Sequence, residues 1–416
     1  MRGKRQPGEP SIQWAAGVNW TEGWRGVMSQ RTGRAVLVAH PSPDRYGSDL
    51  QLLETIDAFR DQRWDVTVVL PRHGPLVELL HAHGADVRIT PFPVLSKAML
   101  SPRRLLTLIA DSGRALLSAR RELTRVRPQV VWVNTLTEPV WVLAGRLARL
   151  PVVCHVHEAE EDVPRPVRIA LAGPLLLTRA VVVNSGAAQR ALVDVLPRLQ
   201  GRIRLVHNGM SGPPGEVTAP RARLPHDPLR VALAGRIAPR KGTDLALEAV
   251  ARLRREGMAV TLHLYGTVFS GYEWFEQQLR ARAQEPDLRE SVTFHGYVSP
   301  IWQAMGAADL VLVPSRAEPF GNVAVEAMLS CRPVVAAAVQ GLTEIVVDGE
   351  TGLLAAANDA DSLADRIREV ALDPVRAAQL AVAGRERALE RFTAARYREQ
   401  VLRVLEDCLP GGGQPG

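Results

Sequence analysis

Short apolar runs alternate with amphipathic stretches along the chain. The runs are of strand length and have no regular polar positions, which is typical of strands buried on both faces of a parallel sheet. The stretches between them carry apolar residues at helical spacing. In the first half we therefore expect strands at 34–39, 66–70, 87–89, 130–134, 152–156, 180–183 and 203–206, with helices at 50–60, 76–83, 102–125, 139–148, 171–178 and 187–195. This alternation predicts an α/β fold.

A stretch rich in Pro and Gly at 208–230 interrupts the pattern and reads as a linker. Beyond it we expect strands at 231–234, 261–265, 292–294, 310–313, 334–337, 345–347 and 352–354, with helices at 243–255, 272–283, 301–307, 323–329, 361–371 and 374–392. The chain thus predicts two Rossmann-like domains, 34–208 and 230–393, that face each other across a cleft and are joined by residues 209–229. A last helix is expected at 394–408. Residues 1–33 show no clear period and are expected to be a poorly ordered extension, and 409–416 a disordered tail.

Composition narrows the class of protein. The 416 residues are 46% hydrophobic and 23% charged, as in a soluble globular protein. The net charge of +7 comes almost entirely from scattered arginine, without the basic and aromatic stripe of a nucleic-acid binder, so no nucleic-acid partner is expected. The three cysteines have no metal-ligand spacing, and no apolar run is long enough to span a membrane. No apolar segment follows the basic N-terminus, so no signal peptide is expected, and we predict a cytoplasmic protein.

Two cations follow the first strand of the second domain. Arg236 comes directly after that strand, and Lys241 lies just before the next helix. A guanidinium and an ammonium at the carboxyl end of a strand suit a diphosphate. The alternative is that both are solvated surface cations, which we expect of Arg240. Lys241 favours the functional interpretation, since the chain has only two other lysines.

Two carboxylates flank a Pro/Gly turn later in the second domain. Glu318 lies in the loop before a predicted helix, and Glu326 lies inside that apolar helix. Glu318 alone could be a cap or a partner of the helix dipole. Glu326 needs a hydrogen-bond donor, because an unpaired buried carboxylate is costly, and a ribose diol would supply one. An acid/base pair is the other interpretation of the two residues.

The first domain offers histidines and one glycine. His155 and His157 follow alternation and should point to the same side of their strand. We interpret His155 as structural, and no third ligand is spaced to complete a metal site. Gly47 lies between the first strand and the first helix, where a phosphate could approach the backbone. The loop matches neither G-x-G-x-x-G nor a Walker motif.

Taken together, these segments resemble the retaining glycosyltransferases of family 4, which have the GT-B fold. The matching segments occur in one order from Asn208-Gly209 onward, and the resemblance covers nearly all of 34–408. They are Gly235-Arg236, Lys241-Gly242, residues 295–297, 309–315, 318–321, Glu326-Ala327, 341–349 and 351–354. One departure stands in the first loop, where the family often has paired glycines and this chain has Tyr46-Gly47-Ser48-Asp49.

The resemblance implies the role of each residue. It implies that Arg236, Lys241 and Gly47 contact the donor diphosphate and that Glu326 binds the ribose. It implies that the donor sugar is held by Glu318 with the backbone of Phe320, Gly321 and Asn322. His157 would lie near the reacting face of the sugar. The resemblance thus implies that the catalytic residues are His157, Glu318, Arg236 and Lys241.

The resemblance also implies the reaction. A nucleotide-diphosphate-sugar would donate its sugar, with retention, to a hydroxyl acceptor such as a glycan, a lipid-linked acceptor or a small molecule. Two cations can stabilise the leaving diphosphate, so neither a metal nor another cofactor is expected. The apolar stretch 93–101 suggests peripheral membrane contact. The alternatives are a sugar-nucleotide epimerase or phosphorylase of the same fold, or a non-catalytic binding subunit. Loss of Lys241 or Glu318 would mark such a subunit, and both are present.

Overall fold

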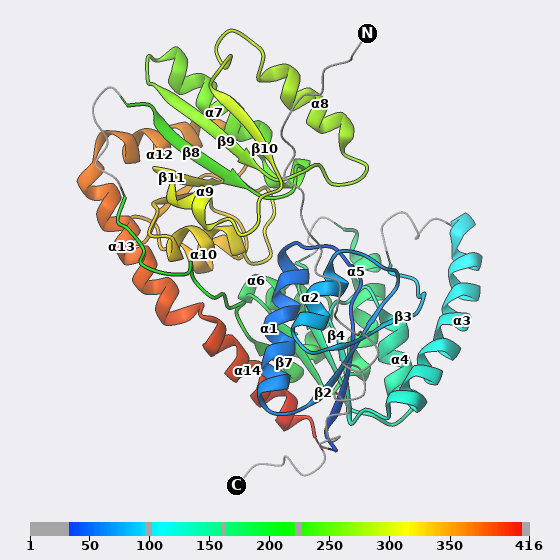
Figure 1. The fold of residues 1–416 in the computed structure, drawn as a ribbon. Coiled ribbons are helices and arrows are strands. Elements are labelled where there is room, and N and C mark those ends of the chain that lie inside the picture. Colours follow the sequence, from blue (N-terminus) through cyan, green and yellow to red (C-terminus); the bar gives the residue numbers. More distant parts are fainter. Residues whose placement is uncertain (1–32, 96–101, 160–162, 221–226, 410–416) are drawn as a thin grey trace, which may run out of the picture.

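Two parallel sheets, each covered by helices, form the two halves of the molecule (Figure 1). The computed structural model describes residues 33–95, 102–159, 163–220 and 227–409. Most of the predicted N-terminal extension, most of the C-terminal tail and part of the 93–101 stretch lie outside these residues. The architecture confirms the predicted α/β fold. No helix in the described ranges has both the length and the apolarity that a membrane crossing requires.

The first sheet has seven strands in the order β3-β2-β1-β4-β5-β6-β7. The strands are β1 (Ala35–Ala39), β2 (Asp65–Leu70), β3 (Asp86–Ile89), β4 (Val130–Val133), β5 (Val152–Val156), β6 (Ala180–Val183) and β7 (Ile203–Leu205). The helices are α1 (Gly47–Asp61), α2 (Leu76–Ala82), α3 (Pro102–Val126), α4 (Pro139–Leu147), α5 (Arg165–Ala172) and α6 (Gly186–Val195). All strand pairs are parallel, so every carboxyl end lies at one edge of the sheet.

The second sheet has six strands in the order β10-β9-β8-β11-β12-β13. The strands are β8 (Leu229–Ala234), β9 (Val260–Tyr265), β10 (Val292–Gly296), β11 (Leu310–Val313), β12 (Val334–Ala337) and β13 (Leu353–Ala355). The helices are α7 (Thr243–Arg255), α8 (Glu273–Arg282), α9 (Trp302–Gly306), α10 (Asn322–Leu329), α11 (Leu342–Ile345), α12 (Ala360–Leu372), α13 (Pro374–Arg391) and α14 (Ala394–Asp407). These strands are also parallel.

Strand alternation divides each core into two layers. Val36 and Val38 of β1 pack into the cluster on one face of the first sheet, whereas Leu37 and Ala39 pack into the cluster on the other face. Both layers are buried, which explains why central strands such as β1 and β4 have no polar positions. The hydrophobic effect therefore fixes both the sheet and the helices that cover it.

The chain crosses between the two halves at neighbouring points. Met210 N donates to Phe392 O over 2.9 Å, and Ala394 N donates to Met210 O over 3.1 Å. Helix α13 leads from the second half into α14, which lies beside α1 of the first half (Figure 1). The Tyr397 ring of α14 is buried in the first core, and its hydroxyl lies 2.5 Å from Thr55 Oγ1. The last helix is thus packed as part of the first half.

One predicted strand is wrong. The run 345–347 is apolar and β-branched, but Ile345 is the last residue of the short helix α11. Leu342 and Ile345 lie three residues apart and both are buried in the same cluster, which a helical turn permits and a strand does not. Tertiary packing here overrides the β propensity of the sequence.

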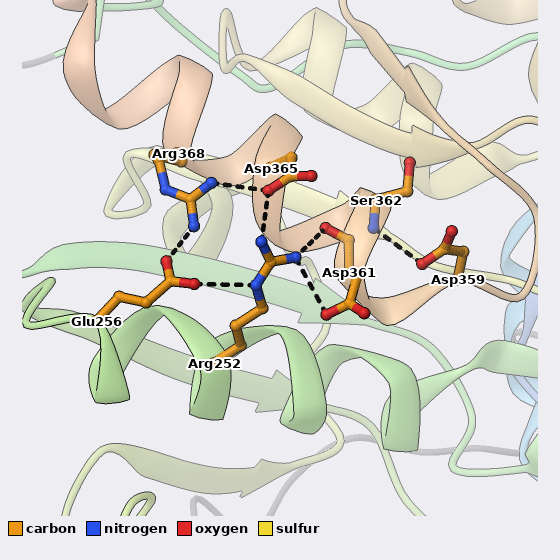
Figure 2. Close-up of polar contacts among 7 residues, drawn as sticks. All are labelled: Arg252, Glu256, Asp359, Asp361, Ser362, Asp365 and Arg368. Atoms are coloured by element: carbon orange, nitrogen blue, oxygen red, sulfur yellow. Dashed lines mark hydrogen bonds and ion pairs between the residues drawn. The ribbon is translucent and has the colours of Figure 1, made fainter.

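An ion-pair network ties α7 to α12 on the outside of the second half (Figure 2). Arg252 of α7 lies 3.0 Å from Glu256, 3.0 Å from Asp361 and 3.1 Å from Asp365. Arg368 pairs with Glu256 and Asp365. The Asp359 carboxylate accepts from Ser362 N over 2.9 Å and caps α12. This network orients a covering helix and lies on the surface.

Candidate active site

Loops after the strands of both sheets meet between the two halves. Tyr46, just before α1, places its hydroxyl 2.7 Å from Thr267 Oγ1 of the second half. The Tyr297 hydroxyl, after β10, donates to Arg45 O over 3.0 Å. The two tyrosine rings contact edge to face at 5.4 Å. The predicted site residues therefore lie where the carboxyl edges of two sheets face each other, the usual position of ligands in α/β folds.

Lys241 and Glu318 form a buried ion pair. Lys241 Nζ donates to Glu318 Oε2 over 2.5 Å, and Ser315 Oγ donates to the same oxygen over 3.1 Å. The turn that carries Lys241 ends at Gly242, where φ is 67° and a Cβ would lie 2.0 Å from Pro314 O. Burial favours the neutral form of Glu318, but the charges of Lys241 and Arg240, together with these hydrogen bonds, hold the pKa of this carboxyl below its usual value.

Arg236 is held by aromatic rings and a carboxylate. Its guanidinium carbon lies 3.9 Å from the centre of the Tyr46 ring and 4.9 Å from that of Phe269. Its Nη2 lies 3.5 Å from Asp49 Oδ2 on the first half. Cation–π contacts and the ion pair keep the guanidinium at the boundary of the two halves.

Glu326 differs from Glu318 in its surroundings. It lies in the first turns of α10 and has no side-chain hydrogen bond to any residue that the structure describes. Burial raises the pKa of Glu326 to about 7, against a partial opposing effect of the Lys241 charge. Glu326 is therefore an unsatisfied acceptor close to Lys241. The two carboxylates are not an equivalent acid/base pair, because one is ion-paired and the other is not.

The loop between these carboxylates presents backbone and not side chains. The Phe320 ring is buried in the core, 5.8 Å from the Phe392 ring. Gly321 has a φ of 122°, in the region that favours glycine, and it caps α10. The Asn322 side chain accepts from Asn208 Nδ2 over 2.9 Å. Among the described residues, the backbone N–H groups of Phe320, Gly321 and Asn322 donate no hydrogen bond within the chain.

His155 and His157 lie on the same side of β5, as alternation predicts, with ring centres 4.0 Å apart. His155 is fully buried beside Trp132 and Tyr397, and burial holds its pKa well below the usual value. His157 Nε2 lies 3.2 Å from Asn134 Oδ1. The described residues contain no cluster of three side chains able to hold a metal ion.

Gly47 is the first residue of α1, and a Cβ at this position would have no atom within 4 Å. Protein packing therefore does not require glycine here. The ring of its neighbour Tyr46 contacts Arg236, the cation predicted to bind the diphosphate, so Gly47 lies one residue from that contact.

Comparison with known proteins decides the family. A model of "Glycosyl transferases group 1" matches residues 217–387, and one of "Glycosyltransferase Family 4" matches residues 47–211. A D-inositol 3-phosphate glycosyltransferase of Nocardia farcinica is 35% identical over 375 residues, which cover 82% of each chain. The chain belongs to glycosyltransferase family 4.

Two further comparisons concern a second relative and a solved structure. A D-inositol 3-phosphate glycosyltransferase of Stackebrandtia nassauensis is 32% identical over 276 residues, and this alignment covers 62% of the chain and 61% of that relative. The crystal structure of Anabaena HepE in complex with UDP-glucose superimposes with a TM-score of 0.74. It is 25% identical, and the alignment covers 90% of this chain and 99% of HepE. This similarity to a solved glycosyltransferase-fold structure confirms the predicted GT-B fold.

The candidate site contains residues that the sequence analysis missed. His40 and Asn134 are the first residues after β1 and β4, and Asp49 is the third residue of α1. A polar residue directly after each buried strand was a signal that could have found the first two. Asp49 accepts from Tyr46 N over 3.1 Å, a capping-box bond that its place three residues after Tyr46 could have indicated.

Glu344 was also missed, and it joins the two halves of the glycosyltransferase. Its carboxylate accepts from Gly186 N and Ala187 N, each over 2.8 Å, at the start of α6 in the first half. His207 lies 3.6 Å away. Burial opposes ionisation, but His207 and the two N–H groups hold the pKa of Glu344 below its usual value. This contact spans 158 residues of sequence and could not be read from spacing.

Proposed function

We propose that the protein is a retaining, metal-independent glycosyltransferase that moves a sugar from a nucleoside-diphosphate-sugar to a hydroxyl acceptor. The observation that carries this proposal is the pair of cations, Arg236 and Lys241, after β8 at the boundary of the two halves. The name of HepE's ligand, UDP-glucose, supports a donor of this class.

The donor's diphosphate would lie against Arg236, Lys241 and the backbone at Gly47. Each cation already faces a carboxylate, Asp49 for Arg236 and Glu318 for Lys241. A diphosphate with two negative charges competes well for both cations, because charge-assisted contacts strengthen in a cleft that excludes water. Glu318, released in part from Lys241, would accept hydroxyl hydrogen bonds from the donor sugar.

The remaining donor contacts follow from the unsatisfied groups of α10. The free N–H groups of Phe320, Gly321 and Asn322 would hold sugar hydroxyls at the start of the helix. Glu326 would accept hydrogen bonds from the ribose diol, which supplies the donors that the protein does not. His157 would contact the sugar from the first half.

In the reaction, the bond between the anomeric carbon and the diphosphate oxygen breaks. Arg236 and Lys241 stabilise the charge that develops on this leaving oxygen. The acceptor oxygen bonds to the same face of the anomeric carbon, and its proton passes to a leaving phosphate oxygen. No protein nucleophile is then needed, and Glu318 acts by binding and by its charge. The products are a glycoside with retained configuration and a nucleoside diphosphate.

Release of nucleoside diphosphate from a panel of nucleotide-sugars tests the proposal. We would use the full chain in the presence of EDTA, with D-inositol 3-phosphate as the first acceptor because the Nocardia farcinica relative is named for it. Glycan, lipid-linked and small-molecule hydroxyl acceptors would follow. We expect acceptor-dependent release and a product whose anomeric configuration, read by NMR, equals that of the donor. An inverted product, strict dependence on a divalent ion, or epimerised donor without transfer would contradict the proposal.

A further inference from the structure

A chain of polar side chains runs from Arg236 to His157 through the first half. Asp49 Oδ2 faces Arg236 Nη2 at 3.5 Å, and Asp49 Oδ1 lies 3.0 Å from His40 Nε2. His40 Nδ1 lies 3.0 Å from Asn134 Nδ2, and Asn134 Oδ1 lies 3.2 Å from His157 Nε2. His40, Asp49 and Asn134 are each at most 2% exposed. We call these five residues the relay.

Sheet topology creates the relay. His40, Asn134 and His157 are the first residues after β1, β4 and β5, which are adjacent in the sheet. Three parallel neighbours that end together place these side chains in a row along the carboxyl edge. The capping box of α1 then fixes Asp49 at the end of this row.

The direction of each hydrogen bond follows from the chemistry of Asp49. An ionised carboxylate only accepts hydrogen bonds, and Asp49 also accepts from Tyr46 N and faces Arg236. His40 Nε2 must therefore donate to Asp49, and His40 Nδ1 accepts from Asn134 Nδ2, which faces it at 3.0 Å. The amide of Asn134 must then present Nδ2 to His40 and Oδ1 to His157. His157 consequently carries its proton on Nε2.

We infer that Asp49, His40 and Asn134 are positioning residues that fix His157 in the Nε2–H tautomer and leave its Nδ1 as a hydrogen-bond acceptor for a hydroxyl of the donor. This inference rests on the proposed function for the identity of the ligand but not for the tautomer. Among the described residues, His157 Nδ1 is buried and has no hydrogen-bond partner. An unpartnered buried acceptor is costly, and a ligand hydroxyl removes that cost.

The surroundings keep His157 neutral. Burial lowers the pKa of His157 to about 3. The His155 ring lies beside the His157 ring, tilted by 39°, and the Glu158 carboxylate accepts from the backbone N–H of His157 over 2.9 Å. His157 therefore acts by its lone pair and not as an acid. Through Asp49, the contact to the sugar and the contact to the diphosphate share one network.

Nitrogen-15 NMR of histidine-labelled protein reads the tautomer directly. We would assign His157 by its absence in His157→Gln and record wild type and Asn134→Leu, which keeps the volume but removes both hydrogen bonds. We expect the Nε2–H tautomer in wild type and a mixture of tautomers in Asn134→Leu. Asn184→Leu is the matched control, because Asn184 is the buried first residue after β6 and lies outside the relay. It should leave the His157 signals unchanged.

Kinetics then give the functional effect. We expect kcat/KM for the donor to fall about 10- to 100-fold in Asn134→Leu, the loss seen when a metal-bound histidine loses its hydrogen-bond partner, and to change little in Asn184→Leu. A wild-type His157 with its proton on Nδ1 would overturn the inference, and this measurement needs no variant to fold. An equal loss in both variants would also overturn it. A wild type without any transferase activity would contradict the proposed function. The tautomer measured by NMR would still show whether the relay orients His157.

Discussion

The two halves differ in the polar contacts that they place at their shared boundary. On the second-half side, Lys241 and Glu318 form an ion pair at 2.5 Å, and the Glu326 carboxylate has no hydrogen-bond partner among the residues that the structure describes. On the first-half side, His40 hydrogen-bonds to the Asp49 carboxylate and to Asn134, in a buried chain that continues to His157. Ion pairs can exchange partners with a charged ligand, whereas a buried hydrogen-bond chain fixes orientation. The ion pair of the second half can therefore open to a charged ligand, whereas the hydrogen-bond chain of the first half fixes the orientation of its side chains.

The largest effect should come from the second half. In the proposed mechanism Lys241 stabilises the leaving diphosphate, so we expect kcat to fall on the order of 10³-fold in Lys241→Ala. Glu318 is 9% exposed and loses its ion-pair partner, so the variant should also lose about 3 kcal/mol of unfolding free energy. Steady-state kinetics and urea unfolding measure the two effects separately.

Arg240→Ala is the matched control for Lys241, because it removes the neighbouring cation from the same turn. Arg240 is exposed and donates to Ala317 O over 2.9 Å. We expect its kcat to stay within about 3-fold of wild type, in line with the small effects of most surface substitutions. Full activity of Lys241→Ala would show that the ion pair of the second half has no role in the reaction, and the contrast with the first half would fail.

The unpartnered carboxylate predicts a pH dependence. The pKa of Glu326 is raised to about 7, so the folded protein holds this proton where the unfolded chain has lost it. Its contribution to stability is therefore present in acid and is lost as pH rises from roughly 4.5 through 7. The ionised form is the better acceptor for a ribose diol, so donor binding should tighten over the upper part of the same range.

Isothermal titration of the donor across roughly pH 6 to 8 measures this effect, with Glu326→Gln as the isosteric variant. We expect binding to tighten severalfold in wild type and to be weaker and pH-independent in the glutamine variant. A pH profile that persists in Glu326→Gln would assign the titration to another group.

The contact between the halves should give a smaller effect. Tyr46→Ala removes the ring that lies 3.9 Å from the Arg236 guanidinium carbon, so the donor KM should rise about 5-fold, as expected for a cation–π contact worth about 1 kcal/mol. Tyr46→Phe keeps the ring and loses only the hydrogen bond to Thr267. If both variants behave alike, the hydroxyl and not the ring orients Arg236.

The sequence predicted what local patterns encode. Buried strands, helices and the loops that carry Arg236, Lys241 and Glu318 follow from periodicity and from turn residues. The relay does not, because it depends on β4 lying between β1 and β5. Periodicity gives the strands but not their order. The same reason hid Glu344, whose partners at the start of α6 lie across the domain boundary.

The smallest effect is expected far from the cleft, at the network of Figure 2. Arg252 pairs with Glu256, Asp361 and Asp365, all of them at the surface of α7 and α12. Exposed ion pairs contribute little to stability and are screened by salt. Arg252→Ala should therefore leave kcat and donor KM unchanged and lower Tm slightly, with the difference shrinking at high ionic strength. A clear loss of activity would show that the position of α12 affects the donor site. The polar contacts that matter for activity would then not be confined to the boundary between the halves.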